Sequence, residues 1–457
     1  VLFRSDQVMR FHIALLRHFA EGDVKEKVGP FTQLALHREG AAEDVTEFAT
    51  RLAKLQEGFI CACGQKHKLP IADILVGPGV MEGIPAGLQN LGIFGPVHLV
   101  GDTNTMIAAG DKLNSLLESE KILTTKTVYT PKQGDLVPDE AALGRLLMDV
   151  PISAEAILAV GSGTITDLVR FAAYKVGKPF ISVPTAPSMD GYASVVAPLI
   201  VGGFKRTFPA RPPLAIYADL YILRKAPMTM LLAGYGDLIG KFTAKADWQL
   251  GRVLHGEPYC EASLQLMASA LAGCMAEPEA LARRDTRLIG KLTEGLILSG
   301  IAIIMAGNSR PASGAEHLLS HYWEIRSLEE AAHYHLHGIK VGAATPLILN
   351  LYEQMLTVDP YNINESELKA GHADPSSAEH SLKKHFGDRA PEILAEAPEK
   401  RITWEERRQR IALICDHWDA IREIVEQLPG PGSTIVLGGA FPGNLIRNLI
   451  SSRMARG

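Results

Sequence analysis

From about Ile71 to Asp219, short apolar runs alternate with segments of helical spacing. The runs are Val97–Val100, Ile157–Val160, Phe180–Val183 and Leu214–Ala218, and each is followed by Gly, Pro, Thr or Asp. Runs that are apolar throughout are typical of parallel strands with both faces covered, and the helical segments between them fit crossover connections. The pattern predicts a parallel sheet with helices, whose ligands bind beyond the carboxyl ends of the strands.

After about Ala226 the strand pattern nearly vanishes and helical spacing dominates, as in Met228–Leu250, Glu261–Met275 and Arg287–Ala306. The longest apolar stretch, Gly295 to Gly307, is shorter than the roughly 20 residues that span a bilayer. We therefore predict a helical second domain, in which this stretch is a buried helix.

The N-terminal segment predicts one amphipathic helix, because Val45, Phe48, Leu52 and Leu55 follow a helical spacing with charges between them. We interpret it as a packing or dimer-interface element. Residues 1–5 read Val-Leu-Phe-Arg-Ser, and one reading frame of a common sequencing adapter encodes Leu-Phe-Arg-Ser. We expect these first residues to be a sequence artefact.

Composition narrows the range of partners. The 457 residues are 47% apolar, which is enough for two domains with sizeable cores. A formal net charge of -5 without a dense Lys/Arg block argues against nucleic acid or an anionic membrane and favours a small-molecule substrate. Five scattered cysteines do not form a disulfide framework, and no secretory signal is visible, so we expect a cytoplasmic protein.

Two turns at neighbouring strand ends have the composition of a phosphate site. Gly161–Asp167 runs from a strand through a glycine turn into a helix, whose N-terminus offers free N–H groups to a pyrophosphate. The motif departs from GxGxxG, so a tight turn without ligand is the alternative. Thr185–Ser188 ends the next strand and could flank the same nucleotide. Asp102 could bind ribose hydroxyls or could simply cap a helix.

Histidines and one carboxylate in the helical half suggest a catalytic metal. Asp237 lies in an apolar helical window, where a buried carboxylate needs a partner. His317 and His321 are four residues apart and share a helix face, and His337 could face them. Core histidines are the alternative. This donor set suits Zn²⁺ or Ni²⁺ better than Mg²⁺. Asp190, in a turn beyond a buried strand, could bind substrate hydroxyls or serve only as a turn residue.

A second candidate metal site is the segment Cys61-Ala62-Cys63-Gly64-Gln65-Lys66-His67. It supplies only three soft ligands, with a tight Cys-x-Cys spacing. We interpret it as a hairpin turn near the domain edge rather than as a metal site.

Three runs, Val160–Ile165, Ser182–Gly191 and Asn308–His317, closely resemble the sn-glycerol-1-phosphate dehydrogenase family in its bacterial form. That family belongs to the iron-containing alcohol dehydrogenase and dehydroquinate synthase-like superfamily. The resemblance covers roughly Ile71 to Gly342 well, with several long motifs in the right order. It implies an α/β Rossmann-like dinucleotide-binding domain followed by an all-α metal-binding domain.

The resemblance also assigns residues. It implies that Asp237, His317 and His337 bind the metal, nickel in bacterial members and zinc in archaeal ones. It implies that Asp190, Asp237 and His321 contact the substrate and do the catalysis. Residues near the dinucleotide, which is NAD(H) or NADP(H), would be Asp102, Gly163, Thr164, Ile165, Thr166, Asp167, Thr185, Ala186, Pro187, Ser188 and Ser194. We expect residues 1–59 to be a helical extension, 60–225 the nucleotide domain and 226–457 the metal and substrate domain.

The expected reaction is reversible, metal-dependent reduction of dihydroxyacetone phosphate by NAD(P)H to sn-glycerol 1-phosphate in a homodimer. Cationic candidates for the substrate phosphate are Arg310, Lys205, Arg206 and Lys340, with Arg310 preferred because arginine binds phosphate in a bidentate manner. A glycerol dehydrogenase acting on unphosphorylated polyols and a dehydroquinate synthase-like sugar-phosphate cyclase are the alternatives. A catalytically inactive relative is a third.

Overall fold

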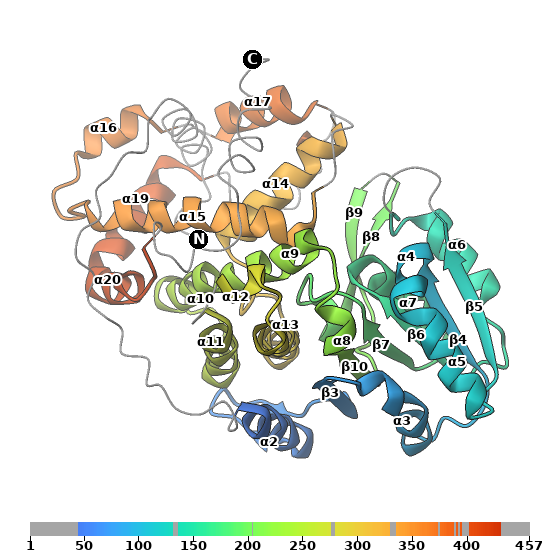
Figure 1. Ribbon diagram of the computed structural model, residues 1–457. Coiled ribbons are helices and arrows are strands. Elements are labelled where there is room, and N and C mark those ends of the chain that lie inside the picture. The colour runs from blue at the N-terminus through green and yellow to red at the C-terminus, as the bar shows by residue number, and fades with distance from the viewer. Residues whose placement is uncertain are drawn as a thin grey trace.

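The computed structural model describes residues 44–430 apart from 131–135, 203, 276–278, 330–334, 373–374, 388–389, 392–393 and 395–401. A sheet with its helices forms one half of the described chain and a group of helices forms the other (Figure 1). The last strand ends at Asp219, and every described element after it is a helix. The predicted fold class, an α/β domain followed by a helical domain, is confirmed.

The main sheet has six parallel strands in the order β3-β10-β7-β6-β4-β5. Its strands are β3 (Asp73–Gly77), β4 (Val97–Asp102), β5 (Thr124–Tyr129), β6 (Ala156–Gly161), β7 (Phe180–Pro184) and β10 (Ala215–Asp219). Two antiparallel hairpins are also present, β1 (Phe59–Ile60) with β2 (Lys66–His67) and β8 (Val196–Val201) with β9 (Phe204–Pro209). The four predicted strands are β4, β6, β7 and β10.

The strand order changes direction between β4 and β6. From β4 the chain moves outward to β5, and from β6 it moves the other way to β7. A crevice forms at such a point in doubly wound sheets, just beyond the carboxyl ends of the two strands. Asp102 ends β4 and Gly161 ends β6. The sheet therefore places both at its expected ligand position.

Both halves of the described chain contain helices. In the α/β half they are α3 (Ile84–Asn90), α4 (Thr103–Thr105), α5 (Asp111–Ser119), α6 (Glu140–Asp149) and α7 (Gly163–Val176). The helical half contains α8 (Leu220–Leu223), α9 (Met228–Ile239), α10 (Lys241–His255), α11 (Glu261–Met275), α12 (Glu279–Ala282), α13 (Thr286–Ala306), α14 (Ala315–Glu329), α15 (His337–Leu356), α16 (Glu365–Ala370), α17 (Pro375–Phe386), α19 (Trp404–Asp416) and α20 (Trp418–Glu426).

The predicted N-terminal helix is α2 (Asp44–Glu57), and it is a packing element of the helical half. Its Leu52 and Leu55 are buried in the same apolar cluster as residues of α9, α11 and α13, and Phe48 packs against that cluster. In Figure 1 the helix lies beneath α11 and α13. The apolar side of α2 is buried against this cluster, and this burial stabilises the amphipathic segment as a helix.

Helix α13 is the one helix in the described ranges that is long and apolar enough to cross a bilayer. It is largely buried, and Leu292, Leu296 and Ile297 are fully enclosed in the helical core. The predicted buried helix is confirmed.

His98 on β4 should make the fold sensitive to acid. Its ring nitrogens lie 2.7 Å from Thr125 Oγ1 and 2.9 Å from Thr127 Oγ1, and burial lowers its pKa to about 4. Because the folded-state pKa is depressed, this contribution to stability is present above the unfolded value of about 6.5 and is lost as the pH falls through 4. We expect a loss of about 3 kcal/mol over that window, measured by urea unfolding. His98→Gln should remove this part of the pH dependence, and an unaltered acid slope would contradict it.

Candidate functional site

Two close helix contacts bring the metal candidates together. A Cβ on Gly234 of α9 would lie 1.8 Å from the Pro187 carbonyl oxygen, and one on Gly338 of α15 would lie 1.9 Å from the Ala233 carbonyl oxygen. Both contacts exclude any larger side chain. Helix α9, which carries Asp237, thus touches the turn after β7 on one side and the start of α15 on the other.

Asp237, His317 and His337 form one group. One ligand atom from each lies within 4.8 Å of the others, and Asp237 is fully buried. His317 Nε2 lies 3.7 Å from Asp237 Oδ1. The His317 and His337 rings are 5.1 Å apart between centroids. His321, the third predicted histidine, stacks on His337 at 5.9 Å and is the most exposed of the three.

Two glutamates that sequence reasoning missed hold these imidazoles. Glu316 Oε1 lies 2.6 Å from His317 Nδ1, and Glu324 Oε1 lies 3.4 Å from His337 Nδ1. Both glutamates are buried. A carboxylate on Nδ1 leaves Nε2 as the acceptor, which is the usual arrangement behind a metal-binding histidine. Burial lowers the pKa of His337 to about 4, so its imidazole is neutral and able to bind a metal.

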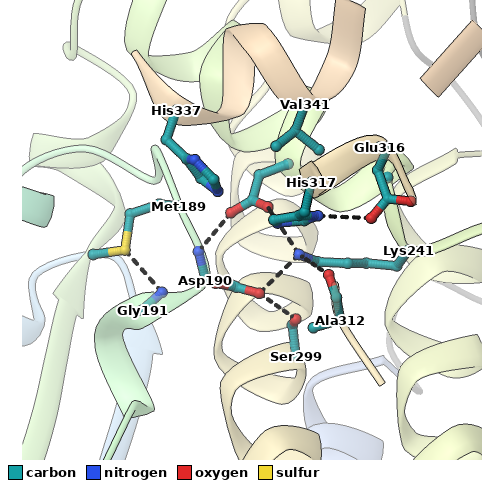
Figure 2. Close-up of polar contacts among 12 residues, drawn as sticks. Met189, Asp190, Gly191, Lys241, Ser299, Ala312, Glu316, His317, His337 and Val341 are labelled. Atoms are coloured by element: carbon teal, nitrogen blue, oxygen red, sulfur yellow. Dashed lines mark hydrogen bonds and ion pairs between the residues drawn. The ribbon is translucent and has the colours of Figure 1, made fainter. Parts of the chain in front are cut away.

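Lys241 is the main residue that the sequence interpretation missed. Its ammonium is fully buried, 2.8 Å from Asp237 Oδ1, 2.8 Å from Asp190 Oδ2 and 3.0 Å from the Ala312 carbonyl oxygen. Figure 2 shows it pointing between Asp190 and Ala312. The sequence did offer a signal for Lys241. It lies four residues after Asp237 in a helical window, and this spacing places the two side chains on one face.

Asp190 connects the nucleotide turn to the metal candidates. Its backbone N–H donates to Asp237 Oδ2 at 2.9 Å, and its Oδ2 accepts from Ser299 Oγ at 2.7 Å. Burial raises the pKa of Asp190, but the Lys241 ammonium outweighs burial and lowers it to about 2. Asp190 is therefore ionised at neutral pH, and the carboxylates of Asp190 and Asp237 share the Lys241 ammonium.

The arrangement fits a divalent metal. One carboxylate and two imidazoles with their second nitrogens fixed leave a coordination position open, as catalytic sites require. The described part of the chain places these three donors in the same buried group, with Lys241 supporting the carboxylate. Their roles as ligands remain a prediction.

The glycine turn fits a nucleotide phosphate. Strand β6 runs through Ser162 into α7, as predicted. The Ser162 side chain does not cap the helix but bonds Ser188 and Tyr192, so the first N–H groups of α7 lack a side-chain cap. The turn after β7 lies alongside, with Thr185 N donating to the Gly161 carbonyl oxygen at 3.3 Å. Free amides at a helix N-terminus bind anions.

Three other residues predicted to contact the nucleotide make hydrogen bonds or ion pairs within the protein. Asp102 caps α4 by accepting from Thr105 N at 2.9 Å, which is the alternative role considered for it. Asp167 is paired with Arg170 at 2.5 Å, and burial raises its pKa to about 6. The Ser194 hydroxyl donates to the Val196 carbonyl oxygen at 3.0 Å. Nucleotide contacts for these three remain predictions.

Arg310 lies in an ion pair rather than among the metal candidates. Its Nη2 is 2.6 Å from Glu257 Oε2, and the same guanidinium donates to the Asp247 carbonyl oxygen at 3.3 Å. Lys205 and Lys340 are placed differently, since each ammonium lies 2.9 Å from the carboxylate of Glu324. Glu324 also contacts His321 and His337, so these two lysines stand beside the histidines.

Gly338→Ala should weaken metal binding without removing a ligand. The new methyl group would force α15 away from α9 and move His337 relative to Asp237. We expect metal affinity to fall at least tenfold, a loss of about 1.4 kcal/mol, measured by competition with a chromogenic chelator. Gly273→Ala in α11 is the matched control, because a Cβ there meets nothing within 4 Å. Equal metal affinity in both variants would contradict the packing argument.

Comparison with known proteins settles the family. The family model for iron-containing alcohol dehydrogenase matches residues 75–227. A glycerol-1-phosphate dehydrogenase (NAD(P)+) of Halalkalibacterium halodurans is 43% identical over 296 residues, covering 64% of this chain and 74% of that relative. One of Geobacillus stearothermophilus is 36% identical over 373 residues, covering 81% and 83%. The chain belongs to the glycerol-1-phosphate dehydrogenase family.

The family resemblance inferred from three sequence runs is thus confirmed. Among solved structures, a glycerol dehydrogenase from Schizosaccharomyces pombe aligns with a TM-score of 0.50 and 15% identity, covering 84% of this chain and 88% of that one. An iron-containing alcohol dehydrogenase from Thermococcus thioreducens gives 0.50 and 12%, covering 85% and 99%. At these identities the likeness shows that this chain shares their fold.

Proposed function

We propose that this chain is a metal-dependent, NAD(P)H-linked dehydrogenase that reversibly reduces dihydroxyacetone phosphate to sn-glycerol 1-phosphate. The observation that carries the proposal is the contact between two sites. Asp190, in the segment after the β7 turn, bonds directly to Asp237 of the metal candidates. A nucleotide on that turn and a metal on Asp237, His317 and His337 would therefore face the same substrate.

The geometry supports a role for each of these residues. A bound divalent metal supplies polarisation of the ketone oxygen, and a bound nicotinamide supplies hydride. Lys241 and Ser299 hold the carboxylate of Asp190 in place, so that it can accept hydrogen bonds from substrate hydroxyls. His321 Nδ1 lies 3.2 Å from Glu324 Oε2, and its half-exposed ring can pass a proton from water to the product oxygen through Nε2.

The substrate phosphate fits best beside Lys205 and Lys340. Both ammonium groups lie next to the histidines, whereas the Arg310 guanidinium is paired with Glu257. Glu324 holds the two lysines at 2.9 Å and fixes their positions. Lys205 comes from β9 and Lys340 from α15, so the phosphate would lie between the two halves of the chain.

Lys205→Met should raise KM for dihydroxyacetone phosphate about tenfold, equivalent to losing one charge-assisted hydrogen bond of about 1.5 kcal/mol. KM for unphosphorylated dihydroxyacetone should stay unchanged, since that ketone has no phosphate. Steady-state kinetics on both substrates checks this. Arg310→Met is the comparison variant. A raised KM in Arg310→Met together with wild-type behaviour in Lys205→Met would restore arginine as the phosphate contact.

The decisive assay follows NADH and NADPH oxidation by metal-stripped protein resupplied with Ni²⁺ or Zn²⁺. Metal-dependent turnover that prefers dihydroxyacetone phosphate to dihydroxyacetone is the expected result. Preference for the plain ketone would instead indicate a glycerol dehydrogenase. Turnover of neither would overturn the proposal and favour a cyclase or a binding protein. The same assay identifies the metal and the nucleotide.

We also infer a homodimer in the cytoplasm. None of the five cysteines forms a disulfide, which suits a reducing compartment. Light scattering on the purified protein tests the dimer, and a monomer mass would reject it.

A further inference from the structure

A second group of potential metal ligands lies away from the proposed active site. Cys61, Cys63, His67 and Cys260 each place one ligand atom within 4.8 Å of the others. The predicted hairpin is present, since Phe59 pairs with His67 and Ile60 with Lys66. Sequence reasoning counted three ligands here. The fourth, Cys260, comes from 193 residues further along the chain than His67, directly before α11.

The distances suit one tetrahedral ion. Cys61 Sγ and Cys260 Sγ are 3.8 Å apart, and His67 Nε2 lies 3.3 Å from both Cys63 Sγ and Cys260 Sγ. Zinc bonds of about 2.3 Å to sulfur and about 2.0 Å to nitrogen require ligand separations of roughly 3.5 to 3.8 Å at tetrahedral angles. Three thiols and one imidazole converging at this spacing form the Cys₃His donor set of structural zinc sites.

The local backbone presents these side chains as metal-binding turns do. Gly64 has a φ of +84° and its N–H donates to the Cys61 carbonyl oxygen at 2.9 Å, which closes a tight turn holding Cys61 and Cys63 side by side. The backbone N–H of Ser263 points at Cys260 Sγ at 3.4 Å. An N–H group that donates to sulfur stabilises the thiolate form, so the Ser263 N–H supports Cys260 as a metal ligand.

We propose that Cys61, Cys63, His67 and Cys260 bind one structural Zn²⁺ ion. Four protein ligands leave no open position, so the ion takes no part in the chemistry at Asp237. The site joins the β1–β2 hairpin, which leads into the edge strand β3, to the N-terminus of α11 in the helical half. His67 and Cys260 are buried, and the apolar side chains of Leu264 and Trp248 shield Cys260.

Such an ion would stabilise the structure around the β1–β2 hairpin. The hairpin strands have only two residues each, and such short pairs are marginal in water. Metal binding adds folding free energy to small elements that cannot bury enough apolar surface themselves. The ion would hold the entry of the sheet against the helical half and so fix one end of the interface between them.

Cobalt substitution tests the proposal on the full-length protein. Co²⁺ bound to thiolates gives a charge-transfer band in the near ultraviolet, whereas Co²⁺ on the aspartate and histidines of the active site does not. We expect the band in the wild type and in Asp237→Asn, with Zn²⁺ displacing Co²⁺ and removing it. Elemental analysis of Asp237→Asn should find one zinc per chain, released by a thiol-modifying reagent into a chromogenic chelator.

Cys260→Ser should weaken the band and lower the zinc content, while Cys415→Ser, which changes a cysteine outside the group, should leave both unchanged. Absence of the band in the wild type would overturn the proposal even if Cys260→Ser fails to fold. A band of wild-type intensity in folded Cys260→Ser would overturn it too, as would a Cys61–Cys260 disulfide in protein purified under reducing conditions. Because activity is not the readout, failure of the proposed dehydrogenase function leaves this test intact.

Discussion

Asp237→Asn will lower kcat for dihydroxyacetone phosphate by at least about a thousandfold. Metal assistance contributes several kcal/mol to the barrier, and each 1.4 kcal/mol corresponds to a factor of ten. The amide keeps the shape of the side chain but removes the charge that the metal needs from this ligand. It also leaves Lys241 paired with Asp190, so the buried cation keeps one partner. Turnover with saturating Ni²⁺ or Zn²⁺ is the measurement.

Asp285→Asn is the matched control for Asp237→Asn. It removes one carboxylate from the same helical half, where Asp285 only caps α13 by accepting from Leu288 N. Its kcat should equal that of the wild type. Wild-type turnover in Asp237→Asn with a full complement of metal would reject the metal-site assignment.

Lys241→Met should lower the free energy of unfolding of the metal-stripped protein by about 3 to 5 kcal/mol. The methionine fills the same space, but the buried carboxylate of Asp237 and the partly buried carboxylate of Asp190 lose the ammonium that lies 2.8 Å from each. Removing one partner from a buried ionic group leaves uncompensated charge, and that is the costly case. Urea unfolding at neutral pH measures the loss.

Lys112→Met is the surface comparison for Lys241→Met. Lys112 lies 2.5 Å from Glu82, but both side chains are more than half exposed, so we expect a loss of about 0 to 1 kcal/mol. Adding Ni²⁺ or Zn²⁺ should restore part of the stability of Lys241→Met, because a cation on Asp237 compensates its charge. Equal losses in the two variants would contradict the burial argument.

Much of the sheet could be predicted because its central strands are apolar on both faces. Runs such as Ile157–Val160 and Phe180–Val183 need two covered faces, and a parallel sheet with helices on both sides provides them. The outer strand β5 was not predicted, since its sequence Thr-Thr-Lys-Thr-Val-Tyr is polar and half exposed at the sheet edge. Edge strands bury too little surface to leave a clear apolar pattern.

The metal candidates were predicted as one group with the help of the family resemblance, because their spacing on helices accounts for only part of that group. The four-residue step from His317 to His321 is a local signal, whereas the distance of His337 from Asp237 depends on how α15 packs against α9. Glu316 and Glu324 were missed because a charged residue on a helix is usually solvated. Sequence order also cannot show that Arg310, the preferred candidate for the phosphate, is paired with Glu257.

The sequence by itself determined the central strands of the sheet, the helical character of the second half, the glycine turn after β6 and the chemical types of the ligands, because periodicity and turn chemistry are local properties. Only the tertiary structure decided which ligands meet. Helix contacts closed by Gly234 and Gly338 place Asp237 against Asp190 and His337, and folding of the hairpin onto α11 adds Cys260 to three ligands nearly 200 residues away. Such contacts depend on the packing of surfaces far apart along the chain, and no local pattern encodes them.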